Sequence, residues 1–165
     1  MKYLMLPCFL VALFLNVEAQ QEQTPAQTIP DFSFRGPGKD PFTKKSLARD
    51  KPLFFIFVDP ECEHCQRAMR TIGEHYASFR KSALYVVSLE SREKIALFID
   101  NYGRPLKGQK NVVLLQDQLN QFIGRFKPRR YPAMMLYSPE GKLLDYEDNA
   151  EAVFRFFKPL GTGKG

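Results

Sequence analysis

Two cysteines separated by two residues form the most reactive pattern of the chain, in the order Cys62, Glu63, His64, Cys65. A cysteine attacks a disulfide only as its thiolate, so a site of this kind must favour loss of the thiol proton. The pair is poorly explained as a stabilising crosslink, because a bond between residues so close in sequence closes almost no loop. The spacing therefore predicts thiol-disulfide exchange, with Cys62 and Cys65 as the catalytic pair.

Metal binding is the first alternative for the same two cysteines. A closed zinc site takes four ligands, and the pair supplies only half of them. The second histidine of the chain, His75, is expected on the helix that follows the cysteines, in a surface or packing role. We predict no metal site and no bound cofactor.

A strand and a helix are expected to hold the pair between them. The unbroken apolar run from Leu53 to Val58, closed by Asp59-Pro60, is typical of a strand buried on both faces. Apolar side chains then recur at helical spacing, namely Cys65, Met69, Ile72, Tyr76 and Phe79. In a helix over about 62–80, Cys62 would meet free backbone N–H groups and the positive end of the helix dipole, which favour a thiolate. Cys65, one turn deeper and more buried, would resolve the mixed disulfide that Cys62 forms with its substrate.

His64 and Glu63 are expected to have opposite effects on the stability of the thiolate. An imidazole between the cysteines can donate a hydrogen bond to the thiolate or pair with its charge, which makes the disulfide more oxidising. The carboxylate of Glu63 should raise the pKa of the neighbouring thiol. The redox potential should then lie between roughly −120 and −270 mV, the range that thiol-disulfide oxidoreductases span. The direction of electron flow stays open.

Strands and helices alternate along the rest of the chain, which indicates an α/β fold. Strands are predicted at 84–89, 112–115, 133–137 and 142–146, with an edge hairpin or a pair of short strands between residues 31 and 50. Further helices should begin at Ser91, at Asp117 and at Asn149, and the first should end at Gly103. The side chains that the last two should bury are Leu119, Phe122, Ile123, Phe126, Val153, Phe156 and Phe157. These elements predict a central mixed sheet with helices on both faces and an N-terminal strand or hairpin extension.

The first residues have the features of an export signal. Lys2 precedes an apolar stretch from Leu4 to Leu15 that is too short for a permanent membrane span. Val17 and Ala19 place small side chains where a leader peptidase would cut, before Gln20. We expect a signal peptide at 1–19, a flexible spacer at 20–28, one domain at 29–158 and a flexible basic tail at 159–165.

Export would also determine the compartment in which the protein works and the partners that it can meet. Cys8 lies in the leader, so the exported chain keeps two cysteines in an oxidising compartment, which we take to be the periplasm. The net charge of +6 could suggest nucleic acid, but export and the scattering of the basic residues favour a solvated basic surface. We expect no nucleic-acid partner and only transient contact of the signal peptide with the membrane.

On these residues the chain resembles the thioredoxin superfamily, and more closely the exported TlpA/ResA-like thioredoxins of bacteria. The resemblance covers about Ile29 to Phe157. Besides the cysteine pair, it rests on Pro30-Asp31-Phe32, Asp59-Pro60, Tyr131-Pro132 and the turn Ser138-Pro139-Glu140-Gly141-Lys142.

The resemblance implies a thioredoxin-like fold in which Pro132 is cis and faces the cysteines. Tyr131 would then lie against the disulfide, and the strand edge beside Pro132 would receive the backbone of an extended substrate. The chain also departs from the family. It has Glu61 where many relatives have a tryptophan, and Ala133 where a threonine often follows the proline. Ile56 and Ala68 stand where relatives carry an acid proposed to handle the proton of the buried thiol. Water and Glu63 remain as candidate acceptors for the proton of Cys65.

The sequence thus predicts a protein-disulfide oxidoreductase of the cell envelope. Its partners would be disulfide-containing or dithiol proteins, and a reductase would also need a membrane thiol electron carrier. A copper-binding thioredoxin-like module is one alternative, although neither His64 nor His75 matches the distant histidine of such relatives. A thiol peroxidase is another, although that family has a proline and a threonine leading into its nucleophile, and residues 54–61 supply no hydroxyl.

Overall fold

The computed structural model describes residues 24–161, which form a seven-stranded sheet in the order β2-β1-β5-β4-β3-β6-β7. The strands are β1 (Ser33–Arg35), β2 (Pro41–Thr43), β3 (Leu53–Phe57), β4 (Ala83–Ser88), β5 (Val112–Gln116), β6 (Ala133–Tyr137) and β7 (Leu143–Glu147). The β3–β4 and β4–β5 pairs are parallel and the other pairs are antiparallel. The predicted mixed sheet with its N-terminal hairpin is therefore confirmed.

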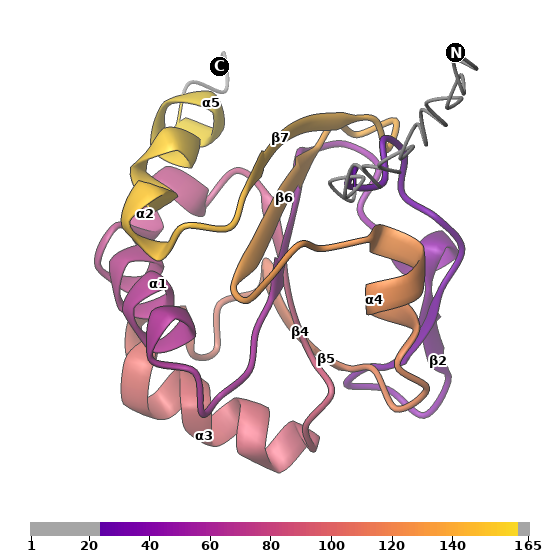
Figure 1. Cartoon of the computed structure of the whole chain (residues 1–165), viewed down its shortest axis with the longest axis horizontal. Helices are drawn as coiled ribbons and strands as arrows, with labels where there is room; N and C mark the ends of the chain where they lie inside the picture. The colour runs from indigo at the N-terminus through magenta and orange to yellow at the C-terminus, as the bar shows by residue number, and fades with distance from the viewer. Residues whose placement is uncertain (1–23, 162–165) are drawn as a thin grey trace, which may run out of the picture.

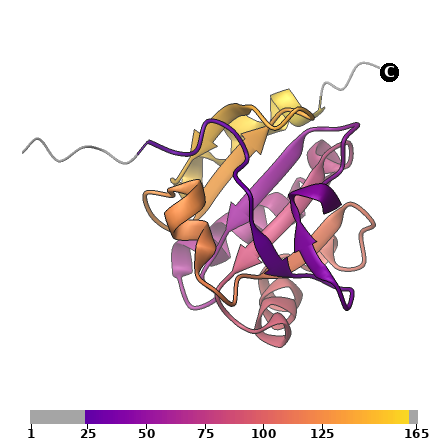
Figure 2. The same ribbon diagram turned by 90° about the vertical axis from the view of Figure 1, so that its right-hand side faces the viewer.

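Helices cover both faces of this sheet (Figure 1). The α-helices are α1 (Glu63–Glu74), α2 (Tyr76–Phe79), α3 (Arg92–Tyr102), α4 (Gln121–Phe126) and α5 (Phe157–Gly161), and the 3-10 helices are η1 (Lys44–Ser46), η2 (Arg104–Leu106) and η3 (Ala150–Phe156). One face carries α1, α2, α3 and α5. Figure 2 looks onto the other face, which carries α4, and shows the N-terminal hairpin β1–β2 at one edge of the sheet.

The central strand β3 separates two hydrophobic cores. Phe54 and Ile56 pack on the face of α1 and α3, whereas Phe55 and Phe57 pack on the face of α4. All four side chains are buried, as the unbroken apolar run predicts. The end of β3 is thus fixed from both sides, and the loop that carries the cysteines starts from a rigid support.

The helix after the cysteines is interrupted, which the sequence pattern did not predict. It ends at Glu74, and His75 adopts a non-helical backbone (φ −105°, ψ 25°) before α2 begins. The imidazole of His75 lies against Phe157, with ring centroids 4.6 Å apart, and Phe79 of α2 stacks on Phe54 at 5.3 Å. The break turns α2 onto α5, a contact between distant parts of the chain. His75 is exposed and its ring packs on Phe157, which agrees with the expected surface or packing role.

Two of the predicted buried side chains near α4 are exposed. Leu119 precedes the helix and is 73% exposed, and Ile123 is also exposed, so both predictions were wrong. The chain enters α4 through Asn120 in the left-handed conformation (φ 51°), which places Phe122 and Phe126, one turn apart, on the buried side. The segment after Asn149 is a 3-10 helix followed by α5, and it buries Val153 and Phe156 while Phe157 stays partly exposed.

The ordered domain extends beyond both predicted limits. The spacer was expected to reach residue 28, but the Ala26 N–H donates to Phe126 O at 2.9 Å and the Leu143 N–H donates to Gln27 O at 2.8 Å. At the other end, Leu160 is buried within α5 although the flexible tail was expected from residue 159. The predicted signal peptide and the last four residues lie outside the described part. Between residues 24 and 161, no helix has the length and apolar character needed to span a bilayer.

Candidate active site

Cys62 and Cys65 lie where β3 leads into α1. Cys62 is the residue before the helix, with an extended backbone (φ −79°, ψ 118°), and its carbonyl accepts the Gln66 N–H at 3.0 Å. Its side chain is partly exposed, whereas Cys65 is fully buried in the first turn. Both are free thiols. The structure therefore places the cysteines as predicted, at the start of a helix, with Cys62 partly exposed and Cys65 buried.

The buried thiol has a strongly perturbed environment. Burial raises the pKa of Cys65 well above its ordinary value, and the hydrogen bond and charge of Cys62 and the charge of Asp59 act in the same direction. The Asp59 N–H opposes this shift by donating to the Cys65 sulfur, with N and Sγ 3.4 Å apart. Cys65 is therefore a protonated thiol at neutral pH, and it needs a proton acceptor before it can attack.

His64 has a partner that the sequence did not suggest. Its Nδ1 lies 2.7 Å from Nη2 of Arg67, and because arginine can only donate, Nδ1 accepts and the ring hydrogen is on Nε2. Arg67 in turn contacts Glu151 through Nε at 3.1 Å and Glu63 through Nη1 at 4.0 Å. The side chain of Glu63 is 85% exposed. The roles predicted for His64 and Glu63 at the thiolate remain predictions.

The segment before β6 forms the opposite side of the site. The Tyr131-Pro132 peptide bond is cis, as the family resemblance implies. The Tyr131 ring stacks on Phe57 with centroids 4.7 Å apart, so the core holds it in place. Burial, followed by the charges of Asp59 and Cys65, raises the pKa of Tyr131 to about 12. Its phenol therefore keeps its proton at neutral pH and can act as a hydrogen-bond donor beside the cysteines.

Two acidic residues near the site, Asp59 after the first buried strand and Asp117 at a helix start, were named in the sequence analysis but given no role in the site. Asp59 closes β3, and its Oδ1 accepts the Glu61 N–H at 2.9 Å. Asp117 follows β5 and is only 1% exposed, with Oδ2 accepting the Phe122 N–H at 2.7 Å. Both carboxylates add to the charge felt by Tyr131. Each follows a parallel strand, so both lie at the edge of the sheet that holds the cysteines. That topology is the signal that could have indicated their place in the site.

The metal alternative gains no further ligands from the structure. Among residues 24–161, no three or more His, Cys, Asp and Glu side chains come together in a way that could hold a metal ion. His64 bonds to Arg67 and His75 packs on Phe157.

The fold and the cysteine pair together define a thioredoxin-like protein with one accessible and one buried thiol. The AhpC/TSA family model matches residues 25–146, and the chain therefore belongs to the AhpC/TSA family. A comparison with curated proteins gave no significant match.

Solved structures with the same fold include several described as thiol-disulfide oxidoreductases. MTB DsbF, solved in mixed oxidized and reduced forms, is 24% identical, with a TM-score of 0.61 over 82% of this chain and 98% of that chain. A DsbE thiol:disulfide interchange protein from Chlorobium tepidum is 14% identical, with a TM-score of 0.61 over 84% and 98%. A secreted Mycobacterium tuberculosis disulfide oxidoreductase homologous to E. coli DsbE is 18% identical, with a TM-score of 0.60 over 78% and 96%. The predicted thioredoxin-like fold and membership of the superfamily are confirmed.

Proposed function

We propose that this protein exchanges disulfides with protein substrates in the cell envelope through Cys62 and Cys65. The observation that carries the proposal is the pairing of a partly exposed thiol at the start of α1 with a fully buried thiol one turn inside. The first thiol can reach a large substrate, and the second can reach only the first. Location in the envelope is supported by the leader-like residues 1–19 and by the description of one structural neighbour as secreted.

The reductive reaction takes two exchanges. The Cys62 thiolate attacks a substrate disulfide, forms a mixed disulfide and releases one substrate thiol, which takes up a proton. Cys65 then loses its proton and attacks Cys62 Sγ, which releases the second substrate thiol and leaves the Cys62–Cys65 disulfide. Two electrons pass to the substrate. The reverse sequence would oxidise a substrate dithiol, and a protein working as a reductase would be reduced again by a membrane thiol carrier.

Asp59 is the acceptor we propose for the Cys65 proton. The acids that relatives use are replaced by Ile56 and Ala68, which are buried apolar side chains here. Asp59 is bound to Cys65 through its own N–H, and its carboxylate is close enough to influence the thiol. A bridging water would carry the proton. Glu63, the acceptor suggested by sequence, is exposed and paired with Arg67.

A matched pair of variants separates these acceptors. Asp59→Asn keeps an oxygen for the Glu61 N–H but removes the base, so release of the second substrate thiol in a single turnover should slow by about 100-fold at pH 7. Glu63→Gln should leave that rate unchanged within about twofold. If this release were slow in Glu63→Gln and normal in Asp59→Asn, Glu63 would be the proton acceptor. If it were normal in both variants, water would be the acceptor.

The function itself is tested by reduction of insulin disulfides with dithiothreitol as electron donor. The wild type should accelerate this reaction, and Cys62→Ser should abolish the acceleration. Turnover retained by Cys62→Ser would reject the proposal. If the protein consumed hydrogen peroxide but did not reduce insulin, a thiol peroxidase would be favoured. If it bound Cu(I) tightly but did not reduce insulin, a metal-binding module would be favoured. The potential of the pair, measured against glutathione, would indicate oxidation or reduction as the cellular direction.

A further inference from the structure

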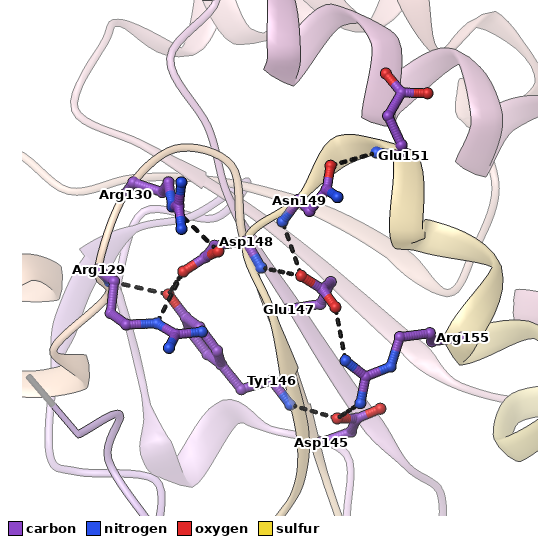
Figure 3. Close-up of polar contacts among 9 residues, drawn as sticks. All are labelled: Arg129, Arg130, Asp145, Tyr146, Glu147, Asp148, Asn149, Glu151 and Arg155. Carbon is purple, nitrogen blue, oxygen red and sulfur yellow. Dashed lines mark hydrogen bonds and ion pairs between the residues drawn. The ribbon is translucent and has the colours of Figure 1, made fainter. Parts of the chain in front are cut away.

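A network of charged and polar side chains lies around the end of β7 (Figure 3). It joins the loop before Pro132 to the end of β7 and the start of η3. Nine residues take part, namely Arg129, Arg130, Asp145, Tyr146, Glu147, Asp148, Asn149, Glu151 and Arg155. The network has two parts, joined by the Asp148 N–H, which donates to Glu147 at 3.0 Å, and by the Tyr146 N–H, which donates to Asp145 at 2.9 Å. The side chains of only one part contact the loop.

The first part is centred on Asp148, whose side chain is only 4% exposed. Arg129 Nε donates to Oδ2 at 2.8 Å, and Arg130 Nε lies 3.1 Å from Oδ1. The Tyr146 hydroxyl also donates to Oδ2, at 3.1 Å, and accepts the Arg129 N–H at 2.9 Å. The Arg129 guanidinium lies 4.7 Å from the centre of the Tyr146 ring. Both carboxylate oxygens are thus occupied, and Arg129 is held through its backbone as well as its side chain.

This arrangement restricts the loop next to the site. Burial of a carboxylate costs free energy unless the carboxylate is paired, so breaking its ion pairs with Arg129 and Arg130 would be unfavourable. Successive residues of an extended chain point to opposite sides, and the backbone must therefore bend for Arg129 and Arg130 to meet one carboxylate. Tyr131 and Pro132 follow directly. Their position relative to the cysteines is fixed at one end by β6 and at the other by Asp148.

We propose that Asp148 is a positioning residue that holds residues 129–130, so that Tyr131 and Pro132 present a preformed edge to a polypeptide substrate. This inference rests on the proposed function, because it concerns how a protein disulfide is brought to Cys62. Asp148 would act through Arg129 and Arg130 and not on the reacting sulfurs. Its loss should weaken docking of a protein substrate and leave the intrinsic reactivity of the cysteine pair intact.

The second part of the network offers a matched control on the same strand. Arg155 Nη1 donates to Glu147 at 2.6 Å, and its Nη2 donates to Asp145 Oδ1 at 3.0 Å. These contacts join β7 to η3 and do not involve the loop before Pro132. Asp145→Asn therefore removes one negative charge from β7, as Asp148→Asn does, without releasing Arg129 or Arg130.

The test compares a large and a small substrate in the full-length protein. Insulin reduction gives KM and kcat with a polypeptide, and the reduction of the Cys62–Cys65 disulfide by dithiothreitol reports on the cysteines alone. Asp148→Asn should raise KM for insulin by about fivefold to tenfold and leave the dithiothreitol rate within about twofold of the wild type. Asp145→Asn should change neither. An unchanged KM in Asp148→Asn, or an equal rise in Asp145→Asn, would overturn the inference.

A milder variant covers the case in which Asp148→Asn does not fold. Tyr146→Phe removes only the hydroxyl that joins Asp148 to the Arg129 N–H and keeps the ring on which Arg129 lies. KM for insulin should again rise, by a smaller factor, and a wild-type KM would count against the inference. If the wild type did not reduce insulin, the proposed function would be rejected, and this inference would be rejected with it. If the wild type reduced insulin and only the KM predictions failed, the inference alone would be rejected.

Discussion

Phe57 connects the hydrophobic core to the candidate site, and its replacement by leucine gives a prediction for both. Its ring is buried between Phe122, at a centroid distance of 4.4 Å, and Tyr131, at 4.7 Å, and both pairs are stacked. A stacked aromatic pair contributes about 0.5–1.5 kcal/mol beyond the area it buries, so the loss of both costs roughly 1–3 kcal/mol. Leucine keeps much of the apolar surface, and the total stays below the ~3–5 kcal/mol of a buried Phe→Ala change.

We therefore expect Phe57→Leu to lower the free energy of unfolding by about 2 kcal/mol and the melting temperature by about 6 °C. The assay is urea unfolding followed by far-ultraviolet circular dichroism, because the chain has no tryptophan. Phe154→Leu is the control, since Phe154 is 63% exposed and its replacement should change stability by less than about 0.5 kcal/mol.

The same variant should also affect catalysis, because Tyr131 loses the ring that supports it. The kcat/KM for insulin reduction should fall in Phe57→Leu and not in Phe154→Leu. If Phe57→Leu unfolded at the same urea concentration as Phe154→Leu, the stacked rings would add nothing to the core. The reasoning that places Tyr131 through this stack would then be refuted.

Two further predictions follow from burial and packing. Because burial raises the pKa of Cys65, the unfolded chain loses this proton at a lower pH than the folded one, so the reduced protein should lose stability as pH rises above the ordinary thiol value of about 8.5. Unfolding midpoints between pH 7.5 and 9.5 should fall more steeply for the wild type than for Cys65→Ala, and equal slopes would refute this. Gly103→Ala should destabilise by about 1–3 kcal/mol, because the new Cβ would lie 2.7 Å from Cγ of Met69. In α4, a Cβ added at Gly124 would meet open space, so Gly124→Ala should raise the free energy of unfolding by about 0.5–1 kcal/mol. Equal melting temperatures for the two variants would contradict the close packing at Gly103.

Local patterns predicted the features that depend on neighbouring residues. The apolar run from Leu53 to Val58 indicated a strand buried on both faces, and Ser91 was expected to cap α3, where its hydroxyl accepts the Lys94 N–H at 3.3 Å. Cys62 was placed at a helix start by the spacing of the apolar residues after it. Each of these features is decided within one or two turns of chain, and sequence periodicity reports it directly.

Contacts between distant residues could not be predicted in this way. Arg67 meets Glu151 across 84 positions, and Arg129 meets Asp148 across 19. A charged side chain that forms such a pair has no periodic signature, and most charged side chains between residues 24 and 161 are at least partly exposed. The break at His75 has the same origin, because it brings the ring onto Phe157 from the far end of the domain.

The division of labour between the cysteines is the central claim, and trapping the mixed disulfide tests it most directly. In a Cys8→Ser background, each single-cysteine variant is mixed with a protein disulfide and examined by mass spectrometry. Cys65→Ser should accumulate an adduct on Cys62, since no thiol is left to resolve it, and Cys62→Ser should form none because Cys65 is buried. An adduct on Cys65 at a comparable rate, or no adduct on Cys62, would contradict the account.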